Sequence, residues 1–138
     1  MYLIEKHQIM SSIFTKIVKG EIPSYKIAEN EEFLAFLDIM PLVEGHTLVI
    51  PKREVDFIFD LEAEEHKRLW DYAREVGKKL SKTYPNKRVV ISVVGLEVPH
   101  AHIHLMPVTK MSEINFLNER LKFTPEEYEK IVEKITGK

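Results

Sequence analysis

The segment HAHIHLMP, residues 100–107, places His100, His102 and His104 at alternate positions, with apolar residues between them. A repeat of two is the repeat of a β-strand, so the three imidazoles leave one face of a sheet and the apolar side chains enter a core on the other. Same-face neighbours lie about 6.6–7 Å apart along a strand. We therefore predict a strand over residues 100–107 that carries a row of histidines.

Hydrophobic periodicity and turn residues predict the other elements. Ser11 or Ser12 caps a short helix that Gly20 ends. Apolar residues spaced four, three and four apart form the stripe of a long helix over 61–80, namely Leu69, Ala73, Val76 and Leu80. The other predicted strands cover 25–29, 33–38, 46–50 and 88–95, the last covered on both faces. The remaining predicted helices cover 114–121 and a final stretch that opens at Thr124.

This order of elements, strands with one long helix inserted and short helices at the ends, indicates an α+β fold with a mainly antiparallel sheet. The chain has 138 residues, which predicts one domain over 11–138 with a C-terminal helical tail, preceded by an extension over 1–10. The formal net charge of −2 argues against a nucleic-acid polymer as partner. We find no apolar run that predicts a membrane partner, and the absence of cysteine fits a reducing cytoplasm.

Three histidines in strict alternation favour chemistry over a merely polar strand face. A neutral imidazole, with an ordinary pKa near 6.5, has a free lone pair at physiological pH and can act as a nucleophile. The central His102 is best placed for attack, and its neighbours can bind the oxygens of a phosphate. A tri-histidine metal site is a second interpretation, and it requires a sharply curved strand.

Three segments carry a resemblance to a known family. HAHIHLM (100–106) resembles the histidine triad signature H-φ-H-φ-H-φ-φ, where φ is apolar. IFTKIVKGEIPSYKI and FLAFLDIMPLVEGHTLVIPK occur before it in the family's order, so the similarity covers residues 12–107. The resemblance implies the HIT-like fold, and it implies a homodimer in which two sheets join.

The resemblance implies a nucleotide hydrolase or transferase that forms a covalent nucleotidyl-histidine and needs no cofactor or metal. The family's nucleophile falls on His102 and its α-phosphate ligand falls on His104. His100 matches the residue whose carbonyl orients the nucleophile, and His46 matches the family's fourth histidine. The expected substrate is a nucleoside phosphoramidate or a related nucleotide, cleaved at its α-phosphate.

The resemblance also implies a nucleoside pocket. Asp38 matches the acid that holds the ribose hydroxyls, and a carboxylate can accept two hydrogen bonds at once. The apolar walls around the base correspond to Ile13, Phe14, Ile17, Phe36, Ile39 and Leu48.

The chain departs from the family pattern in two places. Ser12 and Thr15 stand where many bacterial relatives carry a C-x-x-C zinc pair, and Glu54 stands where a further histidine is common, so we expect no structural zinc. The loop before the triad is short, with Leu96 and Glu97 at unusual positions. Glu97 either serves a cationic leaving group or faces solvent.

Three alternatives remain open at the level of sequence. The leaving group can be a nucleotide, which makes the protein a dinucleoside polyphosphate hydrolase. The altered loop over 95–99 can leave a purine-nucleotide-binding module without catalysis. The metalloenzyme is the third.

Overall fold

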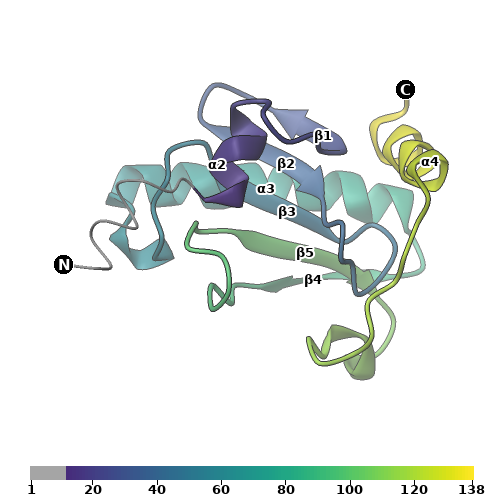
Figure 1. Cartoon of the computed structure of the whole chain (residues 1–138). Helices are drawn as coiled ribbons and strands as arrows, with labels where there is room; N and C mark the ends of the chain where they lie inside the picture. Colours follow the sequence, from purple (N-terminus) through teal and green to yellow (C-terminus); the bar gives the residue numbers. More distant parts are fainter. Residues whose placement is uncertain (1–11) are drawn as a thin grey trace.

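The computed structural model describes residues 12–138 as a twisted five-stranded antiparallel sheet with helices on both faces (Figure 1). The strand order is β1-β2-β3-β5-β4. The bounds are β1 (Lys26–Glu29), β2 (Phe33–Leu37), β3 (Thr47–Pro51), β4 (Arg88–Ser92) and β5 (Ile103–Val108). The predicted α+β class with an antiparallel sheet is confirmed. The expected extension over residues 1–10 lies outside the described residues.

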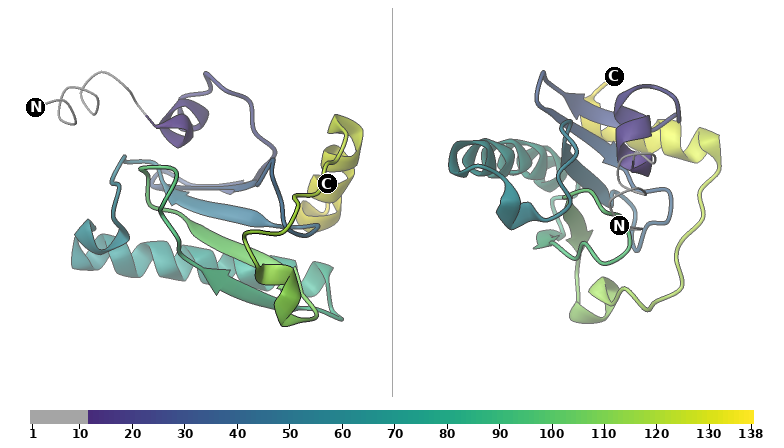
Figure 2. Two further views of the ribbon diagram at one scale, coloured as in Figure 1. Left: turned by 60° about the horizontal axis from the view of Figure 1, so that its bottom comes forward. Right: turned by 60° about the vertical axis from the view of Figure 1, so that its left-hand side comes forward.

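Two helices lie on opposite faces of the sheet, as Figure 2 shows. The long helix α3 (Ala63–Thr83) covers one face, and the short helix α2 (Ile13–Val18) lies over the other. A third helix, α4 (Pro125–Thr136), packs against the edge strand β1 and against α3. Two 3-10 turns complete the described part, η1 (Ile58–Asp60) and η2 (Met111–Ile114). The described residues contain no helix that is long and apolar enough to span a membrane.

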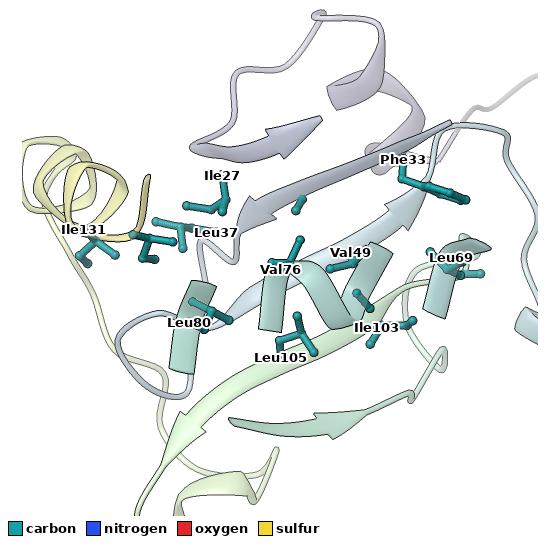
Figure 3. Close-up of a cluster of buried hydrophobic side chains, with 14 of the residues drawn as sticks. Ile27, Phe33, Leu37, Val49, Leu69, Val76, Leu80, Ile103, Leu105 and Ile131 are labelled. Carbon is teal, nitrogen blue, oxygen red and sulfur yellow. The ribbon is translucent and has the colours of Figure 1, made fainter. Parts of the chain in front are cut away.

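The main core lies between α3 and the sheet (Figure 3). The predicted helical stripe is confirmed, since Leu69, Ala73, Val76 and Leu80 are at most 2 % exposed. Fully burying one such aliphatic side chain stabilises the fold by about 1.5–3 kcal/mol. The stripe faces the apolar residues that alternate with the histidines, Ala101, Ile103 and Leu105. The apolar half of the alternation therefore makes the core and leaves the histidines on the other face.

The turn before β3 depends on Gly45. Its φ of +87° is in the left-handed region, which disfavours any residue with a Cβ. A Cβ there would lie 2.8 Å from a ring carbon of Tyr84, whose hydroxyl donates to Glu44 at 2.7 Å. Glycine thus allows the ring of Tyr84 to pack on this turn and fix the point where His46 enters the sheet.

Two strand predictions need correction. The expectation that 88–95 is one strand covered on both faces is wrong, since β4 ends at Ser92 and Ile91 is 55 % exposed. The histidine strand begins at Ile103 instead of residue 100. The reason is that the peptide N–H of Ala101 donates to Val55 O at 2.7 Å, outside the sheet ladder.

The predicted helix over 114–121 is wrong. Only the 3-10 turn η2 forms, and the chain then runs without regular structure to α4. The side chain of Asn115 accepts from the peptide N–H of Leu117 at 2.9 Å, and the N–H of Leu121 donates to Pro41 O at 2.9 Å. These bonds use backbone donors that a helix would need. The turn η1 was not predicted.

Candidate active site

Four histidines from three parts of the chain meet on the sheet face that α3 leaves open. His104 lies on β5, and its register partner on β3 is Leu48. His46 immediately precedes β3, and His102 immediately precedes β5. The ring centroids of His102 and His104 lie 4.9 Å apart, and those of His46 and His104 lie 5.2 Å apart. The rings are closer than the strand repeat suggests, so the row of the sequence becomes a compact cluster.

The ring of His102 is oriented by a backbone carbonyl. Its Nδ1 lies 2.6 Å from the carbonyl oxygen of His100, an atom that can only accept a hydrogen bond. Nδ1 of His102 must therefore carry a proton. In the neutral ring the other nitrogen, Nε2, then has a free lone pair, which is the state that a nucleophilic imidazole requires.

The tautomers of His46 and His104 follow from a chain of hydrogen bonds. The peptide N–H of Leu42 donates to Nδ1 of His46 at 3.0 Å, so the proton of His46 lies on Nε2. That Nε2 lies 2.9 Å from Nδ1 of His104 and donates to it. The proton of His104 therefore lies on its own Nε2. One backbone amide thus leaves His104 with an N–H group available for an anion.

Burial keeps this pair neutral. It is the largest cause that lowers the pKa of His46 to about 3, and the positive charge of Arg120 and the neighbouring His102 ring act in the same direction. Burial also lowers the pKa of His104 to about 3, with further contributions from His46 and His102. Asp38 opposes the shift at His104 but does not overcome it. At neutral pH both rings act as hydrogen-bonding groups without charge.

His100 is held on both ring nitrogens. Its Nε2 donates to Pro51 O at 2.7 Å, and its Nδ1 accepts from the hydroxyl of Ser12 at 2.7 Å. Oε1 of Glu54 completes this network, since it accepts from the peptide N–H of Ser12 at 2.7 Å and from the hydroxyl of Thr15 at 2.6 Å. Hydrogen bonds therefore connect all the residues at the positions where the family pattern implies zinc, and they fix His100.

The proposed base walls divide into a buried and an exposed group. Phe14, Phe36 and Leu48 belong to one apolar cluster, with Ile17 packed at its margin. The ring of Phe14 also meets His102 edge-on, with centroids 5.0 Å apart. By contrast, the side chains that remain open to a ligand are Ile13 at 46 % exposure and Ile39 at 66 %.

Asp38 lies at the His46 end of the cluster. Its Oδ1 accepts the peptide N–H of Met40 at 2.8 Å, and its Oδ2 lies 3.5 Å from Nε2 of His46. The carboxylate thus has the turn-capping bond expected of an aspartate at a strand end, and one oxygen remains toward the histidines. Glu97 is exposed at the far side, in the loop before the triad.

Two residues of the site were missed by sequence reasoning. The ring of Phe116 packs edge-on against His104, with centroids 4.9 Å apart, and the guanidinium of Arg120 lies 5.5 Å from the centroid of the Phe116 ring. Both come from the segment after β5, which was expected to be helical. No local pattern signals these contacts because they join residues that are distant in the sequence.

A metal ion fits these side chains poorly. Asp38, His46 and His104 bring three ligand atoms within 4.8 Å of one another. However, Nε2 of His46 carries the proton that it donates to His104, so it offers no lone pair. The row of His100, His102 and His104 does not converge on one ion either, because both nitrogens of His100 are already bonded. The arrangement suits a phosphate better than a cation.

The sequence model of the HIT domain family matches residues 19–111, which is more than half of the chain. The chain belongs to the HIT family. An uncharacterized HIT-like protein of Mycoplasma genitalium is 38 % identical over 109 residues, which cover 75 % of this chain and 77 % of that protein. An adenosine 5'-monophosphoramidase of Schizosaccharomyces pombe is 35 % identical over 136 residues, covering 94 % and 98 %.

Solved structures agree with the HIT fold. A Hit-like protein from Bartonella henselae, described as involved in cell-cycle regulation, superposes with a TM-score of 0.78 at 27 % identity. The match covers 92 % of this chain and 95 % of that one. The HIT-like fold expected from the sequence is therefore confirmed, and HIT proteins named as phosphoramidases are among the relatives.

We predict that this HIT protein loses stability as the pH falls from 7 to 5. Unfolded imidazoles bind protons below pH 6.5, whereas the folded His46 and His104 do so only near pH 3, so acid favours the unfolded chain. Each group contributes a slope of up to about 1.4 kcal/mol per pH unit. Urea denaturation at several pH values should show a shallower slope for His46→Gln, and equal slopes would contradict the buried neutral pair.

We predict different consequences for two helix caps. Ser12→Ala and Thr124→Ala each remove a side chain that accepts from the helix, at 3.0 Å in α2 and 3.1 Å in α4, and each should cost about 1 kcal/mol. Only Ser12 also donates to His100. Urea denaturation should therefore show a larger loss for Ser12→Ala, which also leaves the buried Nδ1 of His100 without its donor, and turnover should fall only in that variant. Equal turnover of the two variants would remove the Ser12 network from the account of catalysis.

Proposed function

We propose that the protein is a nucleotide hydrolase or transferase that cleaves a nucleoside phosphoramidate, or a related nucleotide, at its α-phosphate. The observation that carries this proposal is the 2.6 Å bond from Nδ1 of His102 to the carbonyl of His100, since it leaves Nε2 of the ring free for attack. A relative that is named adenosine 5'-monophosphoramidase supports this proposal.

In the first step Nε2 of His102 forms a bond to the α-phosphorus as the bond from phosphorus to the leaving amine or phosphate breaks. The leaving group takes its proton from solvent. The ring of the nucleotidyl-His102 intermediate is then substituted on Nε2 and protonated on Nδ1, so it is cationic, and the carbonyl of His100 stabilises that charge. Water attacks phosphorus in the second step, which releases the nucleoside monophosphate and the neutral ring.

The phosphate oxygens are expected to bind His104, whereas the expectation that His46 also donates to them does not fit its two hydrogen bonds. In the tautomers derived above, Nε2–H of His104 is free to donate, and His46 fixes that tautomer from behind. Because both rings are already neutral and oriented, little reorganisation accompanies the build-up of charge. His46 thus acts mainly through His104.

The nucleoside is expected at the Asp38 end. One carboxylate oxygen of Asp38 is available for ribose hydroxyls, and Ile39 and Ile13 present exposed apolar surface beside it for the base. Phe14, Ile17, Phe36 and Leu48 support that surface from below.

The substrate class can be tested by steady-state kinetics with adenosine 5'-phosphoramidate and a diadenosine polyphosphate. We expect turnover of the phosphoramidate, and we expect His102→Ala to lower kcat by about 10³-fold or more while AMP binding by calorimetry stays within a few-fold. Faster turnover of the diadenosine compound would identify a dinucleoside polyphosphate hydrolase. AMP binding without any turnover would indicate a binding module, and wild-type turnover by His102→Ala would refute the nucleophile.

We also propose that the protein is a homodimer joined through β4. This strand has one neighbour in the sheet, and it presents Ile91 at 55 % exposure, with Val93 at 40 % just beyond it. An unpaired, apolar strand edge is a template for pairing with another chain. Sedimentation equilibrium should show a dimer that Ile91→Lys converts to a monomer, and a monomeric wild type would contradict the proposal.

A further inference from the structure

The segment between η2 and α4, here called the C-terminal strap (residues 115–124), lies wholly beyond the matched HIT domain, which ends at residue 111. Figure 1 shows it running from the lower end of β5 past the β2–β3 connection to α4. The β2–β3 connection carries both Asp38 and His46. The strap, which the family pattern does not describe, therefore lies beside the loop that carries these two residues of the candidate site.

Phe116 packs directly on the phosphate-binding pair. Its ring meets His104 at a centroid distance of 4.9 Å and an angle of 75°, and it meets His46 at 6.4 Å and 80°. Both are edge-on arrangements, which are favourable for aromatic rings. A single side chain of the strap thus packs against both His46 and His104 and restricts how far each ring can turn.

Arg120 bridges the strap to the loop that carries His46. Its guanidinium donates to Met40 O at 2.8 Å and to Phe116 O at 3.1 Å, and it lies 5.5 Å from the centroid of the Phe116 ring. The adjacent peptide N–H of Leu121 donates to Pro41 O at 2.9 Å. Three hydrogen bonds and one cation–π contact therefore fix the strap, the loop and the Phe116 ring relative to one another.

Helix α4 contacts both ends of the same loop. The hydroxyl of Tyr128 donates to the carbonyl oxygen of Asp38 at 2.8 Å, and Lys134 pairs with Glu44 at 3.1 Å. The loop that presents Asp38 and His46 is thus held at both ends by residues that follow β5. After burial, the charge of Arg120 is the next cause that lowers the pKa of His46, so the position of Arg120 favours the neutral form of the His46 ring.

We propose that Phe116 and Arg120 are positioning residues for the His46–His104 pair, and that the strap makes the phosphate site of this protein depend on the chain beyond its HIT domain. Neither residue touches the reacting atoms. They act by holding His46 where Leu42 and His104 fix its tautomer. The inference deepens the proposed function and rests on it for its kinetic part only.

The direct test is nitrogen-15 NMR of the imidazoles in the full chain, which reports tautomers without any turnover. In the wild type we expect Nε2–H for His46 and His104 and Nδ1–H for His102. Arg120→Ala and Phe116→Ala should bring the first two rings into tautomer exchange and leave His102 unchanged. Phe116→Leu, which keeps most of the buried volume, serves if the alanine variant does not fold.

Kinetics with adenosine 5'-phosphoramidate provides the second arm. We expect kcat/KM to fall on the order of tenfold in Arg120→Ala. Arg74→Ala is the matched control, because Arg74 is an exposed arginine of α3 with a single weak ion pair to Glu75, and it should match the wild type. Arg120→Lys keeps the charge but lacks the planar fork whose two nitrogens donate separately to Met40 O and Phe116 O, so it should resemble Arg120→Ala.

Two results would overturn the inference. One is an unchanged His46–His104 signature in both Arg120→Ala and Phe116→Leu, and the other is full rescue by Arg120→Lys, which would assign the effect to charge alone. A wild type that turns over no nucleotide would instead refute the proposed function. The NMR result would still decide the role of the strap in that case.

Discussion

The hydrogen bond from Nδ1 of His102 to the carbonyl of His100 is the interaction on which the rest of the site depends. A carbonyl can only accept, so the bond determines which nitrogen of His102 carries the proton and which one is free. The carbonyl is useful only if its own residue does not move. His100 is fully buried, and both of its ring nitrogens are bonded, to Ser12 on one side and to Pro51 on the other. The orientation of the proposed nucleophile is thus set by backbone geometry that the core enforces.

The alternation of residues 100–107 connects the fold to the site. Its apolar members pack against the stripe of α3, where Leu69 and Leu80 are completely buried. The same alternation places the three histidines on the opposite face, where Phe14 of α2 contacts His100 and His102, and His46 contacts His104. A shift of register by one residue would exchange the two sets, so the energy of the core also specifies the position of the histidine rings.

Sequence reasoning predicted the parts that depend on local pattern. The spacings from Leu69 to Leu80 are a signal of this kind and are confirmed. The period of two is confirmed for the strand from Ile103 onward, whereas His100 and His102 precede β5. The strand 88–95 was misjudged because an apolar run does not reveal whether a strand is central or at the edge, and Ile91 is at the edge. The roles of Phe116 and Arg120 could not be predicted, since they depend on contacts with His46 and Met40, about 70 to 80 residues away. The network around Glu54 could be predicted only in part. The family pattern drew attention to Ser12, Thr15 and Glu54, but the structure was needed to show that these residues form hydrogen bonds with one another and with His100.

The most direct test of a nucleophilic His102 is the mass of the intact protein during turnover of adenosine 5'-phosphoramidate, quenched rapidly without acid. The account predicts an adenylyl adduct that maps to His102, that acid removes and that His102→Ala does not form. Turnover without an adduct at the earliest quench time would contradict covalent catalysis, and an adduct on any other residue would contradict the assignment of the nucleophile.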